Sequence, residues 1–356
     1  MIRRRLRETL QGLLLSAPAV TGLLIFVFLP FALSAAYSLT DQRLVSPKPP
    51  EYVGLQNYRD MLGVAMIIQA LTLDPSTGRP LLDADGAIVF PDARSAIRDR
   101  PDLSGFRELL RFTILDQRVI LASRDPTFWR SLVNTIVATS VIVLIQAVLG
   151  LLLALIVSQR LRGMRLFRAA FFVPVVTSIA IMSVVWKFVF NPKQGLLNGA
   201  LSLLPGVGTV EISWLQSTKT ALASVLIVTI WQGVGVQMML FLSGLQSIPP
   251  HLYEAATIDG AGTWHRFRYV TLPGLRTTTT LVVVTLAVFS FRMFTQVDIL
   301  TKGGPSAATT TLFYHIIQTG FVEQRIGYAA AVTVVLFALV TLVVVVLRRL
   351  LRSDDD

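Results

Sequence analysis

The stretch Glu254-Ala255-Ala256-Thr257-Ile258-Asp259-Gly260, followed by Leu272-Pro273, lies between two long apolar segments of the chain. Its first half predicts a short helix, because it combines good helix formers with a polar face. Gly260 and Gly262 are expected to end that helix, since glycine adopts backbone angles that other residues avoid. A second short helix is expected over residues 263–269, capped by Thr263 and ending before Pro273. Two short helices joined by a glycine turn predict a compact knob suited to docking rather than catalysis.

The composition is that of a membrane protein. Of the 356 residues, 53% are hydrophobic and only 15% are charged, which is far from the balance of an ordinary soluble domain. Cysteine is absent, so disulfides and thiolate metal sites are excluded. The formal net charge of +11 comes from short basic clusters beside apolar segments, where such clusters set membrane topology. Nucleic-acid binding is therefore the weaker interpretation of the charge.

Apolar stretches of about twenty residues, the length that crosses a bilayer, predict six membrane spans. They cover residues 13–39, 131–157, 169–190, 220–245, 277–299 and 326–347. Basic residues gather at alternate connections, and because positive loops stay in the cytoplasm both termini are expected there. These residues are Arg3, Arg4, Arg5, Arg7, Arg160, Arg162, Arg165, Arg168, Arg266, Arg268, Arg276, Arg348, Arg349 and Arg352. The first span exceeds the length of a signal-peptide core, which favours an uncleaved anchor.

The segment 41–127 differs from the rest of the chain, since it is polar and rich in proline. The turn sequence at 83–86 lies between two apolar runs and predicts a strand, a turn and a second strand. Farther on, helical spacing is seen in Phe106, Leu109, Leu110 and Ile114. We expect a small mixed extracytoplasmic domain, whose role is either to stabilise the assembly or to contact a binding protein.

A longer motif surrounds the knob. Its fixed spacing joins Glu254-Ala255-Ala256, Gly260, Val270 and Leu272-Pro273. This spacing resembles the signature loop of permease subunits in binding-protein-dependent ABC importers, with Val270 where isoleucine is usual. The resemblance extends from about Phe128 to the C-terminus through Asn134-Thr135, Phe171-Phe172-Val173-Pro174, Trp186, Asn191-Pro192, Gly195-Leu196-Leu197-Asn198 and Gly303-Gly304-Pro305. This set resembles the first permease of carbohydrate importers, similar to the maltose, trehalose and glycerol-phosphate systems.

The resemblance implies an all-α polytopic membrane protein with six transmembrane helices of the type I importer kind. Its parts would be a cytoplasmic N-terminus with the first helix (1–40), an extracytoplasmic insertion (41–127), and a core permease domain (128–356) that contains a cytoplasmic coupling loop (247–276). Such a subunit lies in the cytoplasmic membrane of a bacterium or archaeon. It pairs with a second homologous permease and two ATPase subunits, and it receives a sugar from an extracytoplasmic solute-binding protein. The insertion departs from the family pattern, because trimmed relatives have a much shorter connection there.

By the same resemblance, the signature loop inserts into a cleft on the ATPase and couples hydrolysis to transport. The expected coupling residues are Glu254, Ala255, Ala256, Asp259, Gly260, Leu272 and Pro273. The chain has no glycine-rich loop ending in Gly-Lys-Ser/Thr, so ATP and magnesium are expected on the partner ATPase and no enzyme activity is expected here. No metal site or catalytic residue is expected either, because no metal-binding pattern includes His251, His265 or His315.

Polar residues inside spans are costly, and they are therefore candidates for the translocation path. By alignment with maltose-type relatives, the stations that line this path fall at Thr229, Gln232, Gly233, Val236, Leu286, Phe289 and Ser290. Helix-to-helix hydrogen bonding by Gln232 and close packing at Gly233 and Gly235 are alternatives of equal weight. Arg292 is expected to pair with Asp298, to reach the membrane interface, or to meet an anionic substrate. A neutral substrate is favoured, since no second basic residue shares this span.

A secondary transporter and an intramembrane enzyme are the rival classes of protein. A secondary transporter would carry intramembrane carboxylates or ion-binding broken helices in matched halves, and only Asp298 qualifies. An intramembrane enzyme needs a nucleophile, base or metal set clustered inside the spans, and the sequence shows none. Among importers, a permease for glycerol phosphate or another polyol is the alternative to a sugar permease.

The alternation of basic and neutral connections gives a topology prediction. A reporter fused after Arg100 should be extracytoplasmic, whereas a reporter fused after Gly262 should be cytoplasmic. Short arginine-rich loops are retained inside, but a long segment such as 41–127 is translocated largely regardless of its charge. Alkaline phosphatase and fluorescent-protein fusions at both sites measure this directly. The opposite location at either site would rule out the six-span arrangement.

Overall fold

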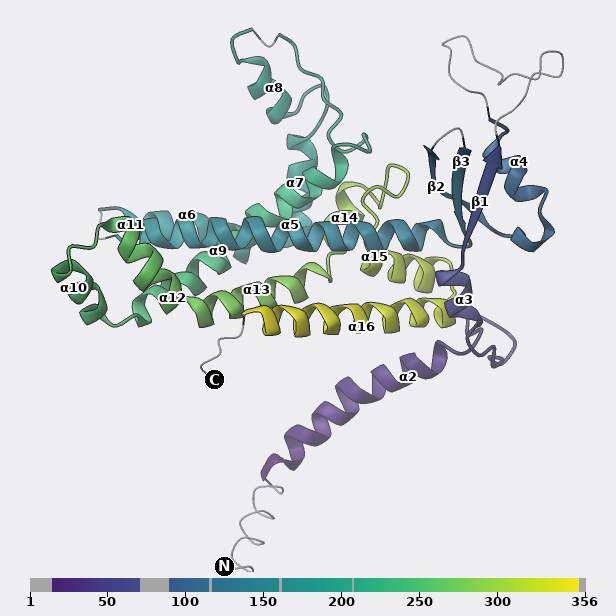
Figure 1. Ribbon diagram of the computed structural model, residues 1–356, viewed down its shortest axis with the longest axis horizontal. Helices are drawn as coiled ribbons and strands as arrows, with labels where there is room; N and C mark the ends of the chain where they lie inside the picture. Colours follow the sequence, from purple (N-terminus) through teal and green to yellow (C-terminus); the bar gives the residue numbers. More distant parts are fainter. Residues whose placement is uncertain (1–14, 71–89, 115–116, 160–161, 207, 352–356) are drawn as a thin grey trace, which may run out of the picture. The chain divides into compact units, whose positions relative to one another are not determined.

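The computed structural model describes residues 15–70, 90–114, 117–159, 162–206 and 208–351, which Figure 1 traces as coloured ribbons. These residues form two compact units. One unit takes the described residues of Thr127–His315 and Phe337–Asp356, and the other takes those of Met1–Pro126 and Ile316–Leu336.

The first of these units is helical. Its long helices are α5 (Pro126–Val157), α6 (Met164–Val176), α7 (Ile179–Val189), α9 (Ala221–Ser247) and α13 (Arg276–Ser290). Shorter elements are α8 (Leu196–Ser202), α10 (Pro250–Ile258), α11 (Thr263–Arg266), η3 (Phe267–Thr271), α12 (Leu272–Gly274) and α14 (Thr295–Leu300). Helices α15 (Leu312–Ile317) and α16 (Ile326–Leu351) are divided between the two units, and η4 (Gln318–Val322) belongs to the other unit. The middle of this unit is α9, which packs against α6, α7, α13 and α14.

Glycines allow α9 to approach its neighbours closely. A Cβ atom at Gly235 of α9 would overlap the carbonyl oxygen of Phe171 on α6. On α5, a Cβ at Gly150 would lie 2.6 Å from the Cβ of Gln237 on α9. Small residues at helix contacts let backbones come together in a bilayer, where lipid supplies no hydrophobic drive for association. The close-packing role expected for Gly235 is confirmed.

The helices bear out part of the predicted span count. Four helices are each long and apolar enough to cross a membrane, and two bent pairs raise the number to as many as six if each pair is one span. The third predicted span is not a single rod, because α6 and α7 meet at an angle of 101°. Pro174 lies inside the end of α6, and proline removes a helix hydrogen bond and favours a break.

The fifth predicted span, 277–299, is also corrected. Helix α13 ends at Ser290, and α14 begins separately at Thr295. On its other side α13 follows a 64° bend after the helical run Thr263–Gly274. Hydropathy identifies apolar residues but not the positions at which a helix bends, so the sequence predicts one continuous span here.

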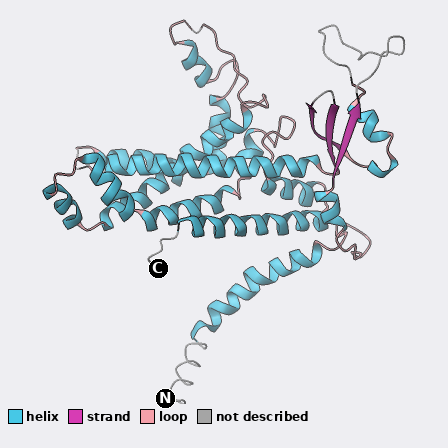
Figure 2. Ribbon diagram, viewed as in Figure 1, coloured by secondary structure: helices cyan, strands magenta, loops and turns pink. Residues whose placement is uncertain are grey.

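The second unit begins with a helix over Leu15–Tyr37, whose parts include the π-helical η1 (Leu24–Phe28) and α2 (Leu29–Tyr37). After α3 (Gln56–Leu62) comes an antiparallel sheet, shown in magenta in Figure 2. Its strands are β1 (Val64–Ala70), β2 (Arg107–Ile114) and β3 (Gln117–Ser123), in the order β1-β3-β2. Between β1 and β2 lie α4 (Ala93–Arg98) and the 3-10 turn η2 (Pro101–Leu103).

This sheet corrects two expectations. The helix predicted from Phe106, Leu109, Leu110 and Ile114 is wrong, since these residues belong to or adjoin β2. The register shifts between Glu108 and Leu110, and a bulge of this kind breaks the alternation by which a strand is normally recognised. The all-α fold class also needs amending for this mixed segment. The strand-turn-strand expected around 83–86 lies outside the described residues.

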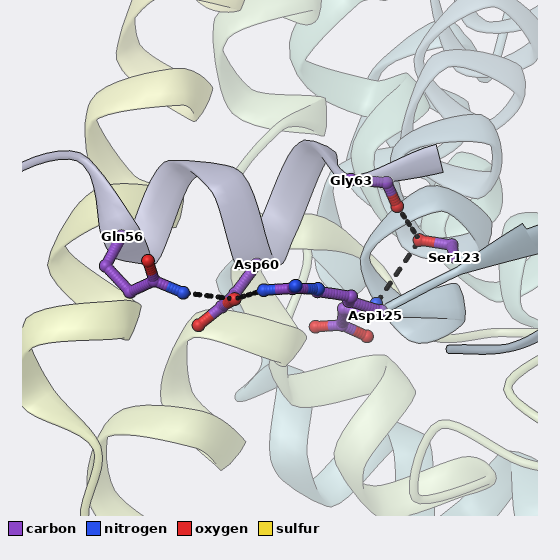
Figure 3. Close-up of polar contacts among 6 residues, drawn as sticks. Gln56, Asp60, Gly63, Ser123 and Asp125 are labelled. Carbon is purple, nitrogen blue, oxygen red and sulfur yellow. Dashed lines mark hydrogen bonds and ion pairs between the residues drawn. The ribbon is translucent and has the colours of Figure 1, made fainter. Parts of the chain in front are cut away.

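Polar contacts fix the base of the sheet to α3 (Figure 3). The Arg124 guanidinium lies 2.6 Å from the Asp60 carboxylate, and the Gln56 amide donates to the same carboxylate at 2.9 Å. The hydroxyl of Ser123 donates to the carbonyl of Gly63 at 2.9 Å. Arg124 and Asp60 are only partly exposed, so this pair is better placed to hold a geometry than a freely solvated surface pair.

The contact at Gly235 yields a stability prediction. Gly235→Val should destabilise the helical unit by about 1–3 kcal/mol, because the added side chain forces α9 away from the backbone of α6. Thermal unfolding of the purified protein in detergent should show a lower Tm. Gly199→Ala on α8 is the control, since its Cβ meets no atom within 4 Å. Equal Tm values for the two variants would contradict the assigned packing.

Candidate functional site

The predicted knob is formed largely as expected. Helix α10 ends at Ile258, and Gly260 adopts a φ of +74°, the left-handed region that glycine enters without strain. The second helix differs from the prediction in two ways. It is preceded by Gly262 with no side-chain cap, so Thr263 is its first residue rather than its cap. It also continues without interruption through a π-helical turn to Gly274, so that Pro273 lies in the last turn of the run.

The knob has an anchored inner side. The Tyr253 hydroxyl lies 3.0 Å from the hydroxyl of Thr271, which links α10 to η3. Tyr253 and Val270 pack against the main hydrophobic core, and Leu275, directly after the knob, is completely buried. The two helical pieces are therefore held together and to the rest of this unit.

Most residues expected to meet the ATPase lie on the outer side. Glu254, Ala255, Asp259 and Gly260 are exposed, as are Leu272 and Pro273, whereas Ala256 is half-buried. Large apolar side chains share this surface, with Ile258 86%, Tyr269 68% and Trp264 66% exposed. Apolar surface of this kind marks a contact site for another protein.

The two carboxylates of the knob form no ion pair with the nearby arginines. A salt bridge from Glu254 or Asp259 to Arg266 or Arg268 would suit an open loop, but none is found among the described residues. Arg266 instead lies 3.5 Å from the hydroxyl of Thr257.

A cavity of about 440 Å³ lies among α5, α7, α9, α13 and α14. All eight residues assigned to the substrate path from the sequence line it, namely Thr229, Gln232, Gly233, Val236, Leu286, Phe289, Ser290 and Arg292. Its size is within the range of small-molecule pockets. The structure brings the predicted residues together, and their contact with a substrate stays a prediction.

Gln232 both lines the cavity and makes the helix-to-helix hydrogen bonds that the sequence offered as an alternative. Its amide nitrogen donates to the carbonyl oxygens of Thr177 at 3.1 Å and of Pro174 at 3.4 Å, at the break between α6 and α7. Its amide oxygen is buried without a hydrogen-bond partner, and the same holds for the amide oxygen of Gln237. Buried acceptors without partners are costly, and both residues belong to the cavity lining.

Gln146 is a cavity residue that the sequence interpretation missed. It is 3% exposed on α5, and its amide nitrogen would overlap a Cβ at Gly233. A side chain at Gly233 would have to displace only the end of the flexible Gln146 side chain, so the contact is close but is not one of backbone against backbone. The signal was present, because Gln146 is an amide within the apolar second predicted span and is therefore a polar residue at membrane depth.

Ser290 and Arg292 lie at the end of α13. The Ser290 hydroxyl donates to the carbonyl of Leu286 at 2.6 Å, which leaves its oxygen free to accept. Arg292 is exposed to the cavity, and no ion pair with Asp298 is found among the described residues. The expected Arg292–Asp298 pair is thus not formed.

Comparison with known proteins identifies the protein family. Residues 146–353 match the family described as binding-protein-dependent transport system inner membrane component. The multiple sugar-binding transport system permease protein of Streptococcus mutans is 33% identical, with 71% of this chain and 86% of that protein covered. The trehalose/maltose transport system permease protein of Thermococcus litoralis is 33% identical over 62% of this chain and 73% of its own length.

A solved structure has a similar fold. It is a bacterial alginate ABC transporter in complex with an alginate pentasaccharide-bound periplasmic protein, with a TM-score of 0.59 at 22% identity. The match covers 64% of this chain and 80% of that one. At this identity the likeness concerns the fold alone.

The chain belongs to the family of inner membrane components of binding-protein-dependent transport systems. It is a membrane-embedded permease subunit of an ABC importer, and the suspected resemblance is confirmed.

The cavity generates a test of the substrate path. Replacing Gln232 and Ser290 together with leucine should reduce transport strongly while the complex still assembles, because each lost partner of a buried hydroxyl costs about 1–3 kcal/mol. Uptake into proteoliposomes and size-exclusion chromatography give the two readouts. Thr280→Val is the control, since Thr280 makes the same kind of hydrogen bond within α13, to Arg276, without lining the cavity. Undiminished uptake by the double variant would assign these residues to packing alone.

Proposed function

We propose that this permease subunit translocates a sugar or oligosaccharide, delivered by an extracytoplasmic binding protein. The names of the sugar permeases from Streptococcus mutans and Thermococcus litoralis support this substrate class. The observation that carries it is the cavity wall, where the amide and hydroxyl residues Thr229, Gln232, Gln237 and Ser290 suit a ligand rich in hydroxyl groups. Phe289, which is 62% exposed, lines the same cavity and offers an aromatic face to the apolar side of a sugar ring.

We further propose an assembly of two homologous permeases and two ATPase subunits in the cytoplasmic membrane, with both termini of this chain in the cytoplasm. ATP and magnesium would be held by the ATPases. The exposed outer side of the knob would dock into them, while its anchored inner side passes their movement to α13 as a rigid body. The cavity would thereby open alternately to the two sides of the membrane.

A polyol phosphate is the second candidate substrate. The observation that favours it is Arg292, which is the charged residue among those lining the cavity in the described part of the chain. A guanidinium group binds phosphate or carboxylate oxygens in a bidentate manner. The amide and hydroxyl residues of the cavity wall suit hydroxyl groups in either substrate.

Stimulation of ATP hydrolysis tests the substrate class. The complex is purified with its binding protein, and neutral sugars, oligosaccharides and glycerol phosphate are compared as ligands. A sugar that raises the rate of hydrolysis and is taken up by proteoliposomes supports the main proposal. Stimulation by glycerol phosphate alone would assign the second substrate, and stimulation by neither class would refute both.

The coupling role of the knob gives a separate prediction. Gly260→Asp should release the ATPase from the membrane or uncouple hydrolysis from uptake, because it adds a charge at the docking surface and about 1 kcal/mol or more of backbone strain at positive φ. ATPase co-purification and uptake per ATP hydrolysed measure this. Ligand binding by the isolated binding protein should be unchanged.

Gly262→Asp is the matched control for that variant. It places the same side chain in the same turn, but Gly262 has a φ of −67°, where aspartate is unstrained and favourable before a helix. Gly262→Asp should therefore be milder. If Gly260→Asp assembles and transports like the parent, the knob is not the coupling element.

A further inference from the structure

The two faces of the β1-β3-β2 sheet differ sharply in burial. On one face, Ile67 and Ile120 are almost fully buried. They form a small core with Ile97 of α4 and Leu103 of η2. This face of the sheet is therefore already occupied by its own domain.

The opposite face is apolar and open. The strand register aligns Met66, Leu121 and Leu110 in one row across the three strands. Met66 is 62% and Leu110 58% exposed. Residues in register across a sheet point to the same side, so this row is a continuous apolar strip.

The next row on the same face repeats the pattern. It aligns Ile68, Val119 and Phe112, of which Ile68 is 52% and Phe112 43% exposed. Beyond the two rows polar residues enter the face, with Arg107 opposite Ser123 at one end, beside the apolar Val64 of β1, and with Gln117 at the other end. An apolar centre with a polar rim is the arrangement of a protein–protein interface. We call the two rows the open sheet face.

The area of the open sheet face indicates a transient rather than a permanent partner. Six apolar side chains, partly exposed, present roughly a few hundred Å², whereas each partner in a stable complex buries about 800 Å². A permanent subunit or a stable second copy of this chain would need more surface. A partner that binds and dissociates in every transport cycle does not need a larger surface.

We propose that the open sheet face is a docking surface for the solute-binding protein. This inference rests on the proposed function, in which the segment 41–127 is extracytoplasmic and the binding protein delivers substrate on that side. The base of the sheet suits the role, because the Arg124–Asp60 pair and the Ser123–Gly63 hydrogen bond fix it to α3. Docking against a fixed base orders few groups and therefore loses little entropy.

The test uses the whole complex in proteoliposomes. ATP hydrolysis is measured against the concentration of the loaded binding protein for the parent and for Met66→Asp combined with Phe112→Asp. The half-saturating concentration should rise at least tenfold in the variant, with the same rate at saturation. Ser104→Asp is the control, because it places an exposed carboxylate in the same domain outside the open sheet face. An unchanged half-saturating concentration, or a loss confined to the rate at saturation, would overturn the inference.

A second measurement guards against a folding defect. A benzophenone amino acid in place of Ile68 should cross-link to the binding protein in the assembled complex. Cross-linking only to lipid or to another membrane subunit would overturn the docking role. If the binding protein does not stimulate ATP hydrolysis by the parent complex, the proposed function itself is refuted. If it stimulates the parent and the double variant has the same half-saturating concentration, only the docking surface is refuted.

Discussion

Close approach of α9 to α5 and α6 is the constraint on which the helical unit depends. Gly235 lies against the backbone of α6, and Gly150 of α5 lies against α9. In a bilayer the lipid competes equally well for apolar side chains, so dispersion contacts at short range have to hold the helices together. A side chain at either glycine would push the helices apart. The walls of the cavity, which α5 and α9 share, would then lose their spacing.

Packing and binding are not alternative explanations of Gln232. Because Pro174 breaks the α6–α7 segment, carbonyl groups at the break lose their helical partners. The Gln232 amide nitrogen supplies hydrogen bonds to two of them. This fixes the side chain and leaves its oxygen without a partner. The helix break that proline creates thereby fixes the orientation of a residue that lines the cavity.

The sequence predicted those features that depend on local composition. The lengths of four spans, helix α10 and the turn at Gly260 follow from hydropathy and from glycine chemistry, and the residues assigned to the path meet in one cavity. The bend between α6 and α7 could not be predicted, since its direction depends on tertiary packing. Strand β2 was mistaken for a helix because the bulge before Leu110 shifts the apolar pattern. Gln146 was missed because polar residues were sought only in the fourth and fifth spans.

The construction of the knob explains how an exposed loop could transmit force. If the exposed apolar surface were carried by a mobile loop, it would follow its partner without moving the rest of the subunit. Here the link between Tyr253 and Thr271 joins both helical pieces, and the second piece runs through η3 and α12 to the fully buried Leu275 at the start of α13. A force applied to Trp264 or Tyr269 would therefore reach α13, whose far end supplies Ser290 to the cavity. In the proposed coupling mechanism, the stiffness of the inner side therefore matters more than the chemistry of the outer side.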